Sequence, residues 1–172
     1  MVFWRIRIRE KPRIEISPED IILAFMHVVE EHGGVMTATR LHKLVTIAEK
    51  EAELDLFTAR PYHYGPFVPE LPNMMKALEK RGLIVSKTLK RDGKTVRIYA
   101  LTPRGRNEAR KSVAKLRRST KGRDALAVAE IWGTAPLFSL LYYVYTRWPY
   151  LASKSRIRSE VLGGSPSPDA GD

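Results

Sequence analysis

The fold is decided by residues 83–101, which read LIVSKTLKRDGKTVRIYAL. Two runs rich in β-branched and aromatic residues are joined by a connection, residues 90–95, with Asp92 and Gly93 at its centre. An Asp-Gly pair between two such runs is a strong signature of a β-hairpin, because both residues adopt the positive φ angles that the turn requires. The sequence therefore predicts one antiparallel hairpin in this stretch.

Three helices are predicted before the hairpin, and each has a recognisable start. The first begins after Ser17, because serine is a favoured N-cap and Pro18 fits the first helical position. The second is capped by Thr37 or Thr39, and the third opens at Pro69. A brief strand at residues 35–36 separates the first helix from the second.

The second helix has an apolar and a polar face. Leu41 and Leu44 recur at helical spacing and are expected in the core. Lys43, Glu49 and Lys50 fall on the other face, which we expect to be solvated.

Further helices are predicted after the hairpin, at residues 103–119 and 123–132, from residue 136, and in a last short helix at residues 153–162. The expected organisation is an N-terminal strand or arm (1–16), a winged-helix domain (17–119), a C-terminal helical extension (120–162) and a disordered tail (163–172). The strand pattern of the first residues is expected to extend through residues 13–16. The fold class is therefore mainly α with a small antiparallel β-hairpin (α+β), in the order of a winged helix-turn-helix with additional C-terminal helices.

The positive charge is concentrated in one part of the chain. The net charge is +11, and residues 72–123 hold 17 of the 30 basic residues but three of the 19 acidic ones. A concentrated positive block favours a polyanionic partner, although a solvated helix face would give the same composition.

Double-stranded DNA is the partner that this pattern favours. A helix fits the major groove, and a cationic hairpin can lie along phosphates or in the minor groove. The residues predicted to contact DNA come from the third helix, the hairpin and the fourth helix: Asn73, Lys76, Lys80, Lys87, Lys90, Arg91, Lys94, Arg97, Arg104, Arg106 and Arg110. RNA or ribosome association is a weaker alternative, because no aromatic stacking motif for RNA is visible.

Three further stretches carry a family resemblance. Residues 39–49 (TRLHKLVTIAE), 62–71 (YHYGPFVPEL) and 78–84 (LEKRGLI) resemble the Panacea (SocA-like antitoxin) and YwgA-like proteins over about a quarter of the chain. The resemblance implies a small helical domain that neutralises a toxin or acts as an adaptor. The long basic hairpin departs from that pattern.

This resemblance makes a protein partner the alternative to DNA. The contact surface would then lie in the loop before the third helix, at Tyr62, Tyr64, Gly65, Pro66, Phe67 and Glu70. The same motif is also explained, as the interpretation that we favour, by a loop folded over the core, because Gly65 allows unusual dihedral angles and Pro66 fixes φ.

Catalysis is not expected. There are no cysteines, the four histidines are not spaced as a metal-binding pair, and no phosphate-binding loop or nucleophile elbow is present, so we expect no enzyme, metal or cofactor. The cysteine-free composition and the lack of a signal or a long apolar segment favour a cytoplasmic protein without a membrane span. The sixth helix, with aromatic residues at 138, 142, 143 and 145, is expected to form either core or a homodimer interface.

Overall fold

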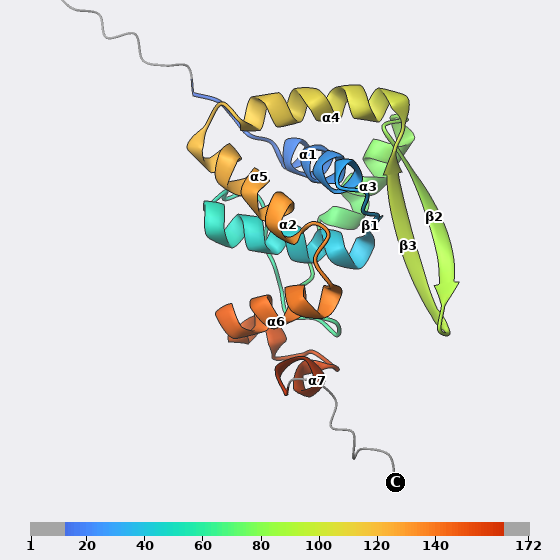
Figure 1. The fold of residues 1–172 in the computed structure, drawn as a ribbon, viewed down its shortest axis with the longest axis vertical. Coiled ribbons are helices and arrows are strands. Elements are labelled where there is room, and N and C mark those ends of the chain that lie inside the picture. The colour runs from blue at the N-terminus through green and yellow to red at the C-terminus, as the bar shows by residue number, and fades with distance from the viewer. Residues whose placement is uncertain (1–12, 164–172) are drawn as a thin grey trace, which may run out of the picture.

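Residues 13–163 are described by the computed structural model and contain seven α-helices, one 3-10 helix and a three-stranded antiparallel sheet (Figure 1). The protein is therefore a mainly helical α+β protein, as the sequence predicts. The elements are α1 Pro18–Glu31, β1 Met36–Thr37, α2 Ala38–Ala52, α3 Leu71–Lys80, β2 Ile84–Arg91, β3 Lys94–Leu101, α4 Pro103–Leu116, α5 Thr120–Trp132, α6 Leu137–Arg147, η1 Pro149–Ala152 and α7 Arg158–Leu162.

The helix starts follow from local capping. Ser17 and Asp20 form a capping box at α1, in which the Asp20 amide donates to Ser17 Oγ at 3.1 Å. Thr37 accepts the Arg40 amide at 3.1 Å, and Thr102 accepts the Gly105 amide at 3.0 Å, so α2 and α4 begin where a hydroxyl satisfies a free N–H group.

The strands form a sheet in the order β1-β3-β2. The hairpin register pairs Arg91 with Lys94 and leaves a two-residue turn, in which Asp92 has φ 50° and Gly93 has φ 74°. Positive φ at both positions is the conformation of a type I′ turn, whose twist matches that of the flanking strands. The predicted hairpin is confirmed, and it projects beyond the helices (Figure 1).

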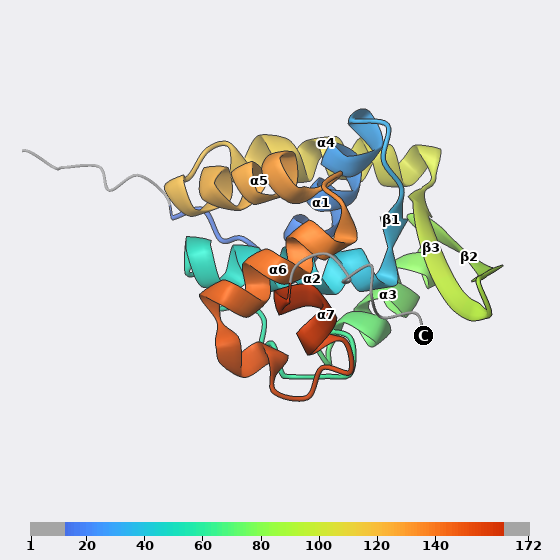
Figure 2. The ribbon, with the colours of Figure 1, turned by 60° about the horizontal axis from the view of Figure 1, so that its bottom comes forward.

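The core lies around α1 and α2. Residues 21–26 of α1 are all buried, and α1 packs between α4, α5 and α2. Helix α2 packs in turn on α5 and α6, so α6 and α7 lie on the far side of α2 from α4 (Figure 2). The hairpin joins this core only at its base, through Ile84, Tyr99 and Leu101.

Several expected boundaries were wrong. Helix α3 begins at Leu71 instead of Pro69, because Val68 donates its amide to His42 and the Glu70 carboxylate accepts the Thr58 amide. These contacts hold the preceding residues outside the helix. Helix α5 begins at Thr120, three residues early, because Ser119 caps it.

The chain ends also differ from expectation. Residues 13–16 do not extend a strand; Ile14 and Glu15 lie beside Lys111 and Ala114 of α4 instead. The last expected helix, residues 153–162, is shorter, since α7 spans only Arg158–Leu162. The rest of the expected N-terminal strand (1–12) and of the tail (164–172) lies outside the described residues. Between residues 13 and 163, no helix has the length and apolar character needed to cross a bilayer.

Candidate nucleic-acid interface

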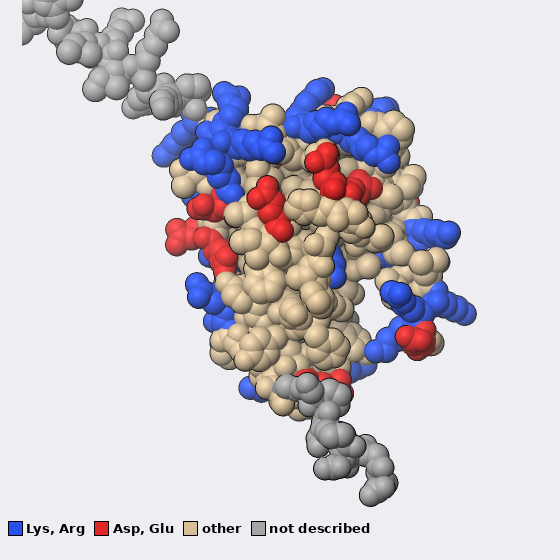
Figure 3. Space-filling view, viewed as in Figure 1, with Lys and Arg blue, Asp and Glu red and all other residues tan. Residues whose placement is uncertain are grey.

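The hairpin presents five basic side chains to solvent. Those assigned to nucleic acid from the sequence are all exposed: Lys87, Lys90, Arg91, Lys94 and Arg97. Within residues 13–163, none of the five forms an ion pair with a carboxylate. Figure 3 shows basic side chains along the projecting hairpin, with a hollow between part of the hairpin and the body.

These cations lie on both faces of the hairpin, because side chains alternate along a strand. Lys90 and Arg97 share the face of Tyr99, which faces the core, while Lys87, Arg91 and Lys94 are on the opposite face. A hairpin laid flat on a surface would use one face only. Cations on both faces suit a hairpin that lies between two rows of phosphates.

Helix α3 presents its own polar side next to the hairpin. Asn73, Lys76 and Lys80 are exposed and recur at positions i, i+3 and i+7, so they lie along one side of the helix. Glu79 accepts hydrogen bonds from the amide of Ser86 at 3.2 Å and from its hydroxyl at 2.7 Å. This contact fixes the base of β2 against α3 and sets the angle between helix and hairpin.

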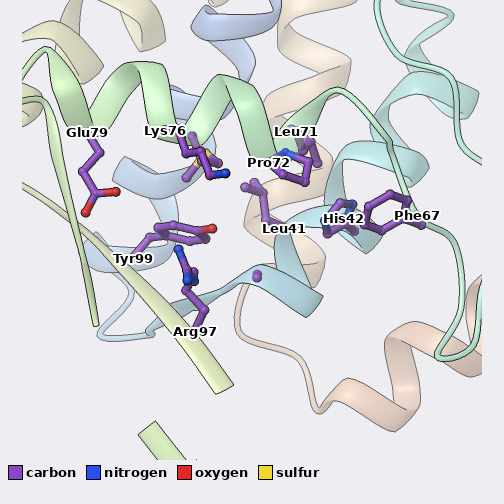
Figure 4. A pocket seen from close by; sticks show the side chains of 11 residues that line it. Leu41, His42, Phe67, Leu71, Pro72, Lys76, Glu79, Arg97 and Tyr99 are labelled. Carbon is purple, nitrogen blue, oxygen red and sulfur yellow. The ribbon is translucent and has the colours of Figure 1, made fainter. Parts of the chain in front are cut away.

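A cavity of about 360 Å³ lies between α3, β3 and the start of α2 (Figure 4). Its apolar lining includes Leu41, Leu71 and Met75. Lys76 from α3 and Arg97 from β3 also line it, so the structure brings two predicted DNA contacts from different elements to one hollow.

The basic residues of α4 lie apart from this group. Arg104, Arg106 and Arg110 are exposed, but α4 packs on α1 and α5, and its side chains form a second basic area along the top of Figure 3. Arg104, in the first turn, is beside Gly82 at the end of α3. Arg106 and Arg110 lie further along α4, so the structure does not bring the whole predicted set together.

The loop before α3, the alternative site, is divided into buried and exposed residues. Gly65 and Pro66 are buried, Phe67 and Glu70 are half-buried, and Tyr62 and Tyr64 are exposed by 49% and 42%. Arg60 and Phe67 exchange two backbone hydrogen bonds of 2.8 Å that close the loop. The loop is therefore folded over the core and presents two tyrosine rings to solvent.

His42 and Lys43 lie beneath this loop, and the sequence did not predict them as site residues. His42 Nδ1 accepts the Val68 amide at 2.9 Å, and its ring stacks on Phe67 with 4.5 Å between centroids. Lys43 Nζ donates to the Pro66 carbonyl at 3.3 Å. Burial lowers the pKa of Lys43 to about 7, and burial with the nearby Lys43 charge lowers the pKa of His42 to about 4.

The expected solvated face of α2 is thus corrected. Lys43 is buried because the connection between α2 and α3 folds back over it, and Glu49, expected on the surface, accepts the amides of Leu56 at 2.7 Å and Phe57 at 2.6 Å. Both side chains hold the connection in place. The length of the connection was the one signal in the sequence that could have shown this.

Comparison of the chain with protein-family models finds no match, and comparison with curated proteins finds no similar sequence. In the part of the chain that the structure describes, no group of three or more His, Cys, Asp or Glu residues is placed to hold a metal ion.

Proposed function

We propose that this protein binds double-stranded DNA as a winged-helix protein and acts as a transcriptional regulator. Helix α3 would lie in the major groove, and the β2–β3 hairpin would be the wing beside it. The element order α1-β1-α2-α3-β2-β3 supports this proposal, because a winged helix-turn-helix has the same order.

One observation carries the proposal: a projecting hairpin holds five exposed cations that have no carboxylate partner in residues 13–163. Charges that the protein leaves unneutralised are available to phosphates, whose binding releases counterions. A hydrophobic or polar protein partner would not require them.

The position of the hairpin beside α3 favours a DNA duplex as the partner over a polyanion without regular structure. Glu79 holds Ser86, so the base of the hairpin is fixed against α3, and a hollow lies between helix and hairpin. Lys76 and Arg97 line this hollow, where one phosphate strand would pass between the major-groove helix and the wing. Asn73 and Lys80, on the same side of α3 as Lys76, would face base edges, at which asparagine pairs with adenine.

The test is fluorescence anisotropy with a labelled mixed-sequence duplex at 50 and 200 mM salt. The variant replaces Lys90, Arg91 and Lys94 with Glu, and the matched control makes the same charge change on α4, at Arg106, Arg110 and Arg117. With six to ten phosphate contacts, wild-type affinity should fall roughly 10³–10⁵-fold between the two salt concentrations.

We expect the hairpin variant to lose most of the binding and the α4 variant to keep most of it. No binding by the wild type at 50 mM salt would overturn the DNA proposal. Equal losses in both variants would show that net charge alone binds the duplex and would overturn the wing assignment. Tighter binding to a single-stranded or double-stranded RNA of the same length would favour the RNA alternative.

A protein partner is the second candidate, and the two exposed tyrosine rings favour it. Tyr62 and Tyr64 project from the loop that the Arg60–Phe67 backbone hydrogen bonds close, and exposed tyrosine rings are contacts of the kind that dominate interfaces. This surface falls within the stretch that resembles Panacea-type antitoxins. Loss of partner capture in Tyr64→Ala, with DNA binding absent in the wild type, would favour it over the first proposal.

A homodimer through α6 would complete the DNA-binding arrangement. One face of α6 is core, with Leu140 and Tyr145 buried, while Phe138 and Tyr142 are exposed by 54% and 53%. A two-fold dimer through the exposed side of α6 would present two hairpins to one duplex. Light scattering of the wild type measures the molar mass of the assembly and so tests the dimer. We also propose that the protein is cytoplasmic.

A further inference from the structure

A second cavity, of about 230 Å³, lies between the start of α2 and the loop that covers it. It shares Ala38, His42 and Phe67 with the larger cavity beside α3, so the two adjoin at the His42 ring. Together they have the size of a small-molecule site.

His42 offers one free hydrogen-bond donor at this junction. Because the Val68 amide donates to Nδ1, that nitrogen carries no proton, and the neutral ring must carry its proton on Nε2. The low pKa, about 4, keeps the ring neutral near pH 7. Within residues 13–163, no acceptor is hydrogen-bonded to Nε2.

Lys43 supplies a positive charge without a counter-ion. Its side chain is 4% exposed, and its ammonium group has three donors, of which one makes a long bond of 3.3 Å to Pro66. No carboxylate among the described residues is paired with it. Burying a cation without a partner is costly, and this favours an anion as the missing partner.

The rest of the lining is mixed, with Thr39, Lys76, Glu79 and Arg97 among aromatic and apolar side chains. Tyr62, Tyr64 and Phe67 border the smaller cavity, and Leu41 and Met75 line the larger one. A planar apolar group would fit against these side chains, while a carboxylate attached to it would reach the buried donors.

We infer that the two adjoining cavities bind a small aromatic carboxylate, with Lys43 and His42 holding the carboxylate and Phe67 and the neighbouring apolar side chains holding the ring. The larger cavity is also lined by Lys76 and Arg97, so this ligand and the phosphate strand of the proposed duplex would share it. The inference itself rests on Lys43 and His42 and does not depend on DNA binding.

The experiment is isothermal titration calorimetry at pH 6.5 with indole-3-carboxylate, and with indole as the uncharged comparison. The variants are Lys43→Met, which keeps an unbranched side chain of nearly the same length without the ammonium group, and Lys50→Met, a matched control because Lys50 is exposed on the same helix. We expect the wild type and Lys50→Met to bind indole-3-carboxylate equally, Lys43→Met to bind it at least tenfold more weakly, and all three to bind indole alike.

NMR titration of ¹³Cε-labelled lysine provides a second measurement, the pKa of Lys43. Ligand binding would not change this pKa if Lys43 only supported the structure. Indole-3-carboxylate should raise the pKa of Lys43, since a nearby anion favours the charged form, and indole should not. The inference is overturned if the wild type binds indole-3-carboxylate no more tightly than indole. It is also overturned if Lys43→Met, shown to be folded by its cooperative unfolding, binds the carboxylate as well as the wild type does.

Discussion

Two tight turns near each other differ in what surrounds them, the hairpin turn at Gly93 and the loop turn at Gly65. Both glycines have positive φ, 74° and 101°. A side chain at Gly93 would meet nothing within 4 Å, whereas one at Gly65 would come within 2.8 Å of Leu141 and 3.1 Å of Lys43. The first turn is free in solvent, and the second is packed into the core.

The basic side chains near the two turns also differ in their exposure to solvent. The hairpin cations are solvated, so holding them costs the fold little, and under the DNA proposal their field would act at long range on a polyanion. Lys43 is enclosed beneath the loop turn, so its charge costs stability and acts only on a group that enters the cavity. A basic protein can therefore use its lysines in two ways that composition does not distinguish.

Removing the buried charge should produce the largest change. With the pKa of Lys43 lowered from 10.5 to about 7, the unfolded chain binds this proton more tightly than the folded protein does. Stability should therefore increase as the pH rises from 7 to 10.5, by about 4 kcal/mol from this group. We expect Lys43→Met to be more stable than the wild type at pH 7 by a similar amount, measured by urea denaturation.

The pH dependence provides the control for this prediction. Because Lys43 is neutral in both states above pH 10.5, the difference between the two proteins should shrink as the pH approaches that value. A Lys43→Met variant that is less stable than the wild type at pH 7 would contradict the picture of an uncompensated buried charge.

The two glycines provide the next test. Gly65→Ala introduces a Cβ against Leu141 and strains a φ of 101°, so we expect a loss of about 3 kcal/mol in the free energy of unfolding. Gly93→Ala adds backbone strain alone and should cost about 1 kcal/mol. Chemical denaturation of both variants measures this, and equal losses would show that the loop turn is no better packed than the hairpin turn.

The parts of the fold that the sequence predicted depend on local chemistry. Ser17 and Thr102 cap helices with their own hydroxyls, and the turn at Gly93 requires nothing outside the hairpin. The start of α3 was misplaced because Val68 is held by His42, 26 residues earlier in the chain. A contact of that separation leaves no periodic signal.

The candidate site shows the same division. The exposure of the hairpin cations agrees with the pattern of the strands, whereas the burial of Lys43 contradicts the polar face assigned to it. Periodicity places a side chain on a face of its helix, but which element covers that face is a tertiary question. The separation of Arg106 and Arg110 from α3 was missed for the same reason, because it depends on α4 packing against α1.

The smallest expected effect concerns a contact between the two turns. Lys94 Nζ lies over the ring of Tyr64, 5.4 Å from its centroid. Both groups are exposed, so the coupling free energy in a double-mutant cycle of Lys94→Ala and Tyr64→Ala should be about 0.5 kcal/mol. Such a weak contact leaves the hairpin free to exchange Tyr64 for a phosphate, and a coupling above about 2 kcal/mol would instead mean that the hairpin is locked to the loop and unavailable to a duplex.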